Sequence, residues 1–334
     1  MRLAVSLDYA RDPVPQIAQM ADLESAGVDL VLVPEVYGFD AATTAGYLAA
    51  RTTTARVGFG VLPVHTRSPA LIAQTAAGLD SLTGGRAVLG LGTSGPGVVT
   101  GFHGVPFTAP LARIREVVAT CRAVWRRDPP PGSALRPILA PPRERIPVHL
   151  ATLRPGGVAL AAEIAEGWYP LFLVPERVEE VWGHALREGA ARRDPSLGTM
   201  EIVASMHVGV GDAEARDAAC AAARRDIALY VGGMGPRGGN FYNELAARFG
   251  WPGAAARIQD LYLAGRRREA EAAIPADMLE ALTVIGPDAA AGERMARLRA
   301  AGVTTLVVRG PAAADPHALA KIRNLLETLG RGHP

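Results

Sequence analysis

The sequence is poor in lysine, and it contains no long apolar run. Lys321 is the only lysine among 35 basic residues, so an anion site in this chain must use guanidinium groups or backbone amides. No apolar stretch approaches the ~20 residues that cross a bilayer. The N-terminal apolar run is interrupted at Asp8, too early for a signal peptide. We therefore expect a cytoplasmic protein without a membrane partner.

Cysteines are also scarce. Cys121 and Cys220 lie far apart, each inside a helical pattern, which is typical of reduced thiols in a reducing compartment. No cysteine or histidine cluster has the spacing of a metal site, so we expect no metal. The net charge of +2 comes from 35 basic and 33 acidic residues, and this balance gives no indication of a nucleic-acid partner.

What the sequence does contain is a regular alternation of strand-like and helical patterns. With 334 residues the chain has room for two domains or one large barrel. The expected strands are Leu3–Asp8, Asp29–Pro34, Val57–Leu62, Ala87–Leu91, Ile146–Ala151, Trp168–Phe172, Ile202–Val210 and Thr304–Arg309. The helices expected after them are Val14–Ala26, Ala41–Arg51, Pro69–Leu82, Leu111–Arg127, Gly156–Glu166, Pro175–Arg193, Ala213–Tyr230 and His317–Leu329. Eight such units close a (β/α)8 TIM barrel, so we predict an α/β fold of this kind as a single domain over 1–334.

Two segments depart from the even spacing. The connection 128–144 is rich in proline, which favours an irregular loop. Residues 232–285 form a long insertion between strands seven and eight, with helices expected near 253–264 and 275–282. We predict that this insertion covers the face formed by the carboxyl ends of the strands, where TIM-barrel enzymes keep their active sites.

The most distinctive stretch is 86–107, in which a strand-like run leads into Gly92-Thr93-Ser94-Gly95-Pro96-Gly97. Gly90, Gly92 and Gly95 match G-x-G-x-x-G, but no acidic residue follows about twenty positions later, so this is not a nicotinamide-dinucleotide fingerprint. Two interpretations stay open: a turn between strand and helix, or a backbone surface against which a flat cofactor lies.

Several segments together resemble a known family. These are VPEVYGFD (33–40), GVLPVHTRSP (60–69), LGLGTSGPGVV (89–99), AEIAEGW (162–168) and LYVGGMGPRGGNFYNEL (229–245). They resemble the bacterial luciferase-like superfamily and, within it, the oxidoreductases that depend on the deazaflavin coenzyme F420. The resemblance implies coenzyme F420, with FMN as the alternative, and a homodimer.

The resemblance also implies where the cofactor lies. Its ring would rest on Gly60, Val61 and Leu62, with a cis peptide bond between Gly60 and Val61, although an ordinary strand end before Pro63 is an alternative. Hydroxyl and amide groups of Thr93, Ser94 and Gly95 would contact the ring or the ribityl chain; a capped turn is the alternative.

A phosphate site is predicted where the fifth strand meets the next helix. The run Thr152-Leu153-Arg154-Pro155-Gly156-Gly157-Val158 combines a strand end, a proline at the helix start and two glycines. Related proteins bind the cofactor phosphate here, although a tight connection is the alternative. Arg154 and Arg237 are the guanidinium groups expected near the acidic tail of F420.

Candidate proton donors and pocket residues complete the predicted site. The resemblance aligns Glu35 with an acid beside the ring, but Val36 stands where many relatives carry histidine. The candidates for the general acid are Glu35, Tyr9, His65 and His103. Tyr37, Trp168 and Tyr169 are expected to wall the substrate pocket, with core packing as the alternative for the last two.

The predicted function is hydride transfer between the deazaflavin C5 and a small organic substrate. The reaction classes are reduction of a C=N bond or an activated C=C bond, or oxidation of an alcohol. Two alternatives stay open: an FMN-dependent monooxygenase and a non-catalytic cofactor-binding barrel.

Overall fold

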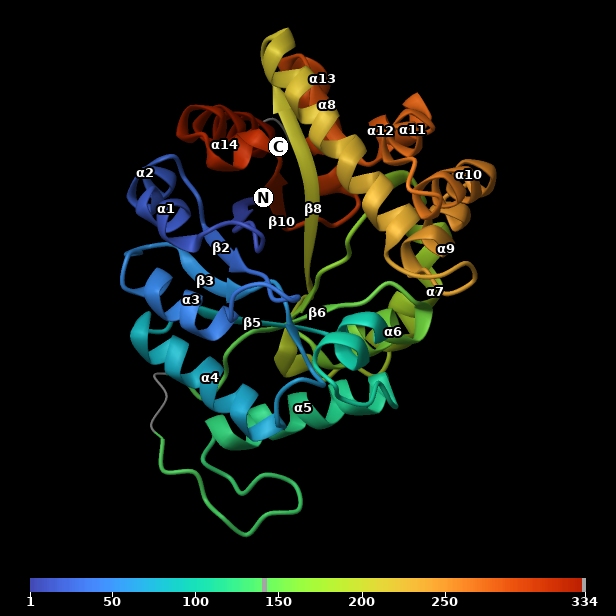
Figure 1. Ribbon diagram of the computed structural model, residues 1–334. Coiled ribbons are helices and arrows are strands. Elements are labelled where there is room, and N and C mark those ends of the chain that lie inside the picture. The colour runs from blue at the N-terminus through green and yellow to red at the C-terminus, as the bar shows by residue number, and fades with distance from the viewer. Residues whose placement is uncertain (140–142, 332–334) are drawn as a thin grey trace.

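The chain forms a closed barrel of parallel strands in the computed structural model, which describes residues 1–139 and 143–331. The barrel strands are β1 (Arg2–Ser6), β2 (Leu30–Val33), β3 (Arg56–Phe59), β5 (Ala87–Gly92), β6 (Val148–Ala151), β7 (Gly167–Trp168), β8 (Glu201–Val210) and β10 (Thr305–Arg309). Strand β10 pairs with β1 on one side and with β8 on the other, which closes the ring. The predicted (β/α)8 barrel is confirmed, and Figure 1 shows its helices arranged around the strands.

Helices surround the barrel in the order that the alternating pattern predicts. They are α1 (Pro13–Ala18), α2 (Met20–Ser25), α3 (Ala41–Ala49), α4 (Pro69–Leu82), α5 (Pro110–Trp125), α6 (Pro155–Ile164), α7 (Val178–Ala190), α8 (Ala213–Ala228), α13 (Asp288–Ala300) and α14 (Pro316–Arg331). Side-chain caps start several of them: Asp40 accepts from the Thr43 amide at α3, and Ser68 accepts from Leu71 at α4. The expected first helix is two helices, because the chain breaks at Gln19.

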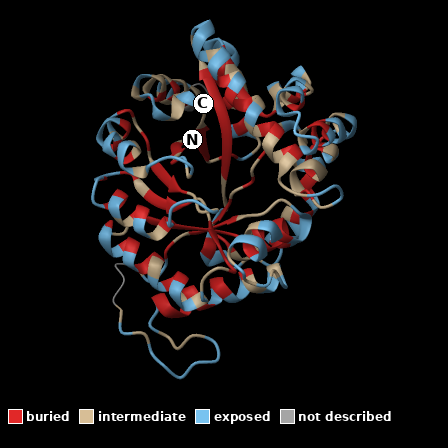
Figure 2. Ribbon diagram, in the orientation of Figure 1, coloured by how far each residue is buried: buried red, intermediate tan, exposed pale blue. Residues whose placement is uncertain are grey.

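Alternate strand residues face two separate cores. Leu3 and Val5 point outward into the large core between strands and helices, and Figure 2 shows the buried faces of the helices turned toward the strands. The smaller core inside the barrel consists of Ala4, Leu30, Leu32, Val88, Val203 and Val307. The barrel is therefore filled in its middle, and a site can form only at its ends.

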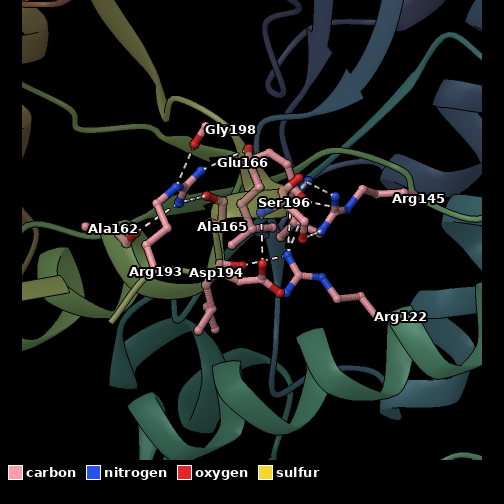
Figure 3. Close-up of polar contacts among 12 residues, drawn as sticks. Arg122, Arg145, Ala162, Ala165, Glu166, Arg193, Asp194, Ser196 and Gly198 are labelled. Carbon is pink, nitrogen blue, oxygen red and sulfur yellow. Dashed lines mark hydrogen bonds and ion pairs between the residues drawn. The ribbon is translucent and has the colours of Figure 1, made fainter. Parts of the chain in front are cut away.

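A network of arginines and carboxylates ties the loops at the amino ends of the strands (Figure 3). Glu166 accepts from the Val148 amide at 3.0 Å and pairs with Arg122 at 3.2 Å and with Arg145 at 3.3 Å. These contacts fix the starts of β6 and β7 against helix α5. Glu166 is thus a structural residue of the segment 162–168.

The predicted insertion, 232–285, begins inside η4 (Leu229–Gly233) and contains α9 (Phe241–Arg248), α10 (Pro252–Leu263), α11 (Arg267–Ala272) and α12 (Ala276–Ala281). It gathers with α8 on one side of the barrel (Figure 1). It ends in a strand that the sequence pattern does not predict, β9 (Thr283–Gly286), which runs parallel to the last four residues of β8. Strand β8 therefore pairs in turn with β7, β10 and β9.

The structure also bears out an irregular proline-rich connection over its described part, and it shows the state of the two cysteines. The proline-rich segment has no helix or strand over residues 128–139, and its residues 140–142 lie outside the described part of the chain. Both cysteines are free: Cys121 is buried and Cys220 is partly exposed. Over residues 1–139 and 143–331, no helix is both long enough and apolar enough to cross a membrane.

Candidate functional site at the carboxyl ends of the strands

A bulge interrupts the third barrel strand at its carboxyl end. Gly58 pairs with Val88, and Leu62, in the short strand β4 (Leu62–Pro63), pairs with Leu91, so four steps on one strand face three on its neighbour. The peptide bond between Gly60 and Val61 is cis, as the resemblance implies.

Glycines on the fourth strand make room for this bulge. A Cβ atom on Gly90 would lie 1.9 Å from the Phe59 carbonyl oxygen, and one on Gly92 would lie 2.8 Å from a methyl carbon of Val61. These two glycines therefore receive the neighbouring strand rather than a cofactor. By contrast, a Cβ on Gly95 would meet nothing within 4 Å.

The predicted ring-binding residues divide into exposed and buried ones. Gly60, Val61, Thr93 and Ser94 are partly exposed at the carboxyl end of the barrel, and Ser94 adopts a left-handed φ of 56°. Leu62 is fully buried in the outer core, so its side chain supports the bulge and does not reach this end. The predicted contact between Leu62 and the cofactor stays a prediction.

The beginning of α6 has the features of an anion site. Its N-cap residue, Arg154, makes no side-chain capping hydrogen bond, and Pro155 opens the helix. The Thr152 hydroxyl is buried and has no hydrogen-bond partner within the described residues. An uncapped helix N-terminus beside an unpartnered hydroxyl fits a phosphate group.

The other residues of this run support the backbone. A Cβ on Gly157 would lie 2.9 Å from the Thr152 Cβ, so glycine lets the helix start close to the strand end; Gly156 is exposed. The Leu153 carbonyl accepts from the Trp182 indole at 2.7 Å, and Val158 is fully buried.

Both arginines predicted near the cofactor tail already have acidic partners. Arg154 pairs with Glu244 at 3.0 Å and lies 4.3 Å from the centre of the Phe241 ring, which links the start of α6 to α9. Arg237 pairs with Asp260 at 2.7 Å. Binding of an acidic tail would have to compete with these exposed ion pairs, and their role in binding stays a prediction.

Glu35 lies in a polar cluster that orders the loop after β2. Its carboxylate pairs with Arg67 through both oxygens and accepts from the Ala41 amide at 2.9 Å. Arg67 also pairs with Asp40 at 2.6 Å, and together these bonds raise the pKa of Arg67. A carboxylate engaged in this way is suited to holding a loop and poorly suited to donating a proton.

The two histidine candidates bridge loops. His65 Nε2 lies 3.2 Å from the Thr108 carbonyl oxygen, while its buried Nδ1 has no hydrogen-bond partner among the described residues. His103 Nε2 lies 3.3 Å from the Val36 carbonyl oxygen. Each ring thus has one nitrogen committed to a backbone carbonyl.

Aromatic side chains form the rim beside β1 and β2. Tyr9 meets Tyr37 edge to face at 6.3 Å, and Tyr37 meets Phe102 at 6.1 Å. Tyr37 is 55% exposed, so it is available to a substrate. Burial, aided by the nearby Tyr230, raises the pKa of Tyr9 to about 12, which keeps this phenol protonated near neutral pH.

Two of the aromatic residues predicted to wall the pocket, Trp168 at the end of β7 and Tyr169 after it, pack in different cores. Trp168 is fully buried, donates to the Thr152 carbonyl at 2.9 Å and packs on Trp182 at 5.0 Å. It belongs to the outer core, which favours the core-packing alternative for this residue. Tyr169 points the other way, packs on the core inside the barrel and is partly exposed at the carboxyl end.

One polar group at this end was not predicted from the sequence. Arg309, the last residue of β10, pairs with Asp226 of α8 at 2.7 Å, and His207 of β8 lies 2.8 Å from the same carboxylate oxygen. The Arg309 guanidinium lies 5.6 Å from the centre of the Tyr230 ring. The sequence did contain one signal for this group, a charged residue at the carboxyl end of an expected strand, where TIM-barrel enzymes place their catalytic residues.

Comparison with known proteins agrees with this architecture. The family model for luciferase-like monooxygenases matches residues 2–305. A Mycobacterium tuberculosis protein provisionally named as a coenzyme F420-dependent oxidoreductase is 36% identical over 96% of this chain and 99% of its own length. A phthiodiolone/phenolphthiodiolone dimycocerosates ketoreductase of Mycobacterium kansasii is 33% identical over 63% of this chain and 59% of its own length.

Solved structures share the fold at lower identity. The F420-dependent tetrahydromethanopterin reductase of Methanopyrus kandleri superposes with a TM-score of 0.79 at 22% identity, over 97% of this chain and 99% of its own. An F420-dependent secondary alcohol dehydrogenase, solved with an F420-acetone adduct, gives 0.73 at 18% identity, over 97% and 98%. The family model covers most of the chain, and the chain belongs to the luciferase-like monooxygenase family.

Proposed function

We propose that this enzyme binds coenzyme F420 at the carboxyl ends of β3, β5 and β6 and transfers a hydride between the cofactor and a small organic substrate. The observation that carries the proposal is the start of α6, where the Thr152 hydroxyl, which has no partner among the described residues, lies beside a helix N-terminus that none of their side chains caps. The name of the M. tuberculosis relative, which matches along almost its whole length, supports F420 as the cofactor.

The residues present fit the parts of such a cofactor. Thr152 and the first amides of α6 would hold the phosphate. The partly exposed Gly60, Val61, Thr93 and Ser94 would lie against the ring and the ribityl chain. When bound, F420 supplies a two-electron hydride donor or acceptor at its C5. The protein's contribution is then to orient the substrate over the ring and to move one proton.

The proposed reaction class rests on the chemistry of hydride transfer and on the names of two relatives. A hydride acceptor must be a polarised double bond, so we propose reduction of a C=O, C=N or activated C=C bond, or the reverse oxidation of an alcohol. Two relatives are named for carbonyl and alcohol chemistry, a ketoreductase and a secondary alcohol dehydrogenase. Their names favour the carbonyl–alcohol pair. The exposed Tyr37 and Phe102 would give such a substrate an apolar rim.

Cofactor titration tests this proposal directly. The purified protein is titrated with F420, FMN and FAD, and binding is followed by fluorescence. We expect F420 to bind at micromolar concentration or below and the two flavins more weakly. Reduced F420 is then mixed with cyclohexanone, cyclohexenone and a cyclic imine. Failure to bind F420 contradicts the proposal, and oxygen consumption with reduced FMN would assign the chain to the flavin-dependent monooxygenases.

A further inference from the structure

Four polar side chains at the carboxyl end of the barrel form a connected series. His207 on β8 and Arg309 on β10 are paired in register, so they lie at the same height on adjacent strands. Asp226, near the end of α8, receives both: His207 Nε2 lies 2.8 Å and Arg309 Nη2 2.7 Å from its Oδ2. About three-quarters of the Arg309 side chain is shielded from solvent, so the guanidinium has little freedom to leave this position.

Charges within the series are defined by these contacts. Burial opposes ionisation of Asp226, yet the hydrogen bond from His207 and the Arg309 charge lower the pKa of its carboxyl overall. Burial lowers the pKa of His207, which favours its neutral form. His207 is therefore neutral, and the Asp226 carboxylate balances the charge of the Arg309 guanidinium. The N–H groups of the guanidinium that Asp226 does not use are available to other partners.

Arg309 also lies beside Tyr230. Its guanidinium is 5.6 Å from the centre of the Tyr230 ring, so the positive charge faces the phenol. A guanidinium only donates hydrogen bonds, so Arg309 leaves the proton of this phenol free for another molecule. Tyr230 is partly exposed, so its hydroxyl is within reach of a bound molecule.

The local backbone explains how Tyr230 reaches this position. It lies in η4, a π-helical turn that continues α8. Gly232 and Gly233 follow, and a Cβ on either would lie 2.5 Å or less from Tyr262 of α10. The two glycines let α10 pack against the turn, which fixes Tyr230 beside Phe172 at 5.7 Å and Tyr242 at 4.8 Å.

We propose that the Tyr230 phenol, beside the Arg309 guanidinium, is the proton donor for the reduction, and that Asp226 and His207 are positioning residues for Arg309. This inference rests on the proposed function. The other candidates are less available: Glu35 is paired with Arg67, and His65 and His103 each engage a backbone carbonyl. Tyr9, Tyr37 and Tyr169 are further phenols at the carboxyl end of the barrel, and none of them has the Arg309 guanidinium against its ring among the described contacts.

The step balances as follows. The substrate carbon receives a hydride from reduced F420, and the electron pair of the C=O π bond moves to oxygen. That oxygen takes the proton of Tyr230, which leaves a phenolate beside the Arg309 guanidinium. Solvent returns the proton to the partly exposed phenol. In alcohol oxidation the same atoms move in reverse, and the phenolate accepts the alcohol proton.

A binding measurement without turnover tests the contact. Cyclohexanone labelled at its carbonyl carbon is added to the complex with oxidised F420, which cannot reduce it, and the carbonyl resonance is recorded by NMR. A hydrogen bond from the phenol moves this resonance downfield. We expect the shift in the wild type and in Tyr242→Phe, and its loss in Tyr230→Phe. Tyr242 is the matched control because it packs on Tyr230 in the same aromatic cluster.

Turnover supplies the second readout. We expect Tyr230→Phe to bind F420 as the wild type does and to lower kcat by ~100-fold or more, with little change in KM. Arg309→Lys, which keeps the charge and loses the planar fork, should lower kcat by a smaller factor. Loss of F420 binding in the wild type would refute the proposed function itself. If F420 binds but wild type and Tyr230→Phe give the same carbonyl resonance, or Tyr9→Phe alone abolishes the shift, the inference is wrong and the proposed function stands.

Discussion

The Glu35 carboxylate and the Arg67 guanidinium face each other in a two-point ion pair, with 2.8 Å between Oε2 and Nη2. Both side chains are largely buried, at 7% and 14% exposure, so water screens the pair only weakly. The pair joins the loop after β2 to the loop before α4, on the rim of the candidate site.

Glu35→Gln should destabilise the fold and spare the chemistry. We expect its free energy of unfolding to fall by about 2–3 kcal/mol, because a charge-assisted bond is lost from a mostly buried Arg67. Glu116→Gln, which breaks an exposed pair with Arg113, should cost less than about 1 kcal/mol. Urea unfolding measures both. A loss of kcat near the ~100-fold typical of a missing general acid would instead return Glu35 to the catalytic residues.

Thr152→Val should weaken cofactor binding without destabilising the protein. The hydroxyl has no partner in the described part of the chain, so its removal costs the fold nothing, whereas a bond to a phosphate is charge-assisted. We expect the Kd for F420 to rise by about 10-fold or more, from a loss of about 1.5–3 kcal/mol. Thr75→Val is the matched control, since Thr75 bonds its own helix on α4. An unchanged Kd would show that the phosphate does not bind at the start of α6.

His149 should make the fold sensitive to acid. Burial is the main cause that lowers its pKa from 6.5 to about 4 inside the barrel, so the folded state holds it neutral. Between these two values the unfolded state binds more protons, and stability falls as pH falls. At pH ~4.5 this group alone costs about 2–3 kcal/mol relative to pH 8. We expect His149→Gln to show a shallower loss of unfolding free energy over this range; equal slopes would contradict the assignment.

The two cysteines should differ in reactivity. Burial raises the pKa of the Cys121 thiol on α5, and the side chain is not accessible, whereas Cys220 on α8 is partly exposed. A thiol-specific chromogenic reagent should therefore modify one cysteine per folded chain and both in denaturant. Cys220→Ser should leave the folded protein unreactive. Rapid modification of Cys121 in native buffer would indicate that α5 opens locally.

The barrel could be predicted because each strand and helix carries its own pattern, while the site depends on contacts between segments far apart in sequence. The run from Ala87 to Gly92 is a strand, as expected, but the purpose of Gly90 and Gly92 is visible only with the Val61 bulge beside them. Trp168 and Tyr169 are adjacent, and a strand turns neighbours to opposite faces; the sequence does not say which face is the core.

The missed elements have the same physical origin. Strand β9 follows a run of helices in the insertion, and it exists because the end of β8 offers it a partner that the local sequence does not reveal. In the sequence, Arg309 is an ordinary residue at the end of a strand. Its ion pair with Asp226, 83 positions earlier, is visible only in the tertiary structure. Local pattern predicts elements, whereas ion pairs between elements require the tertiary fold.

Strand β8 has three partner strands, and this pairing predicts how the chain would behave after a protease cuts it. The insertion leaves through α8, which follows β8 directly, and returns through β9, which is hydrogen-bonded to the end of the same strand. A protease cut near Gly265, in the turn between α10 and α11, would leave both fragments anchored to one ribbon of backbone. The two pieces should therefore co-migrate in native gels and separate only in denaturant, which makes this loop a suitable point for splitting the chain into complementing halves.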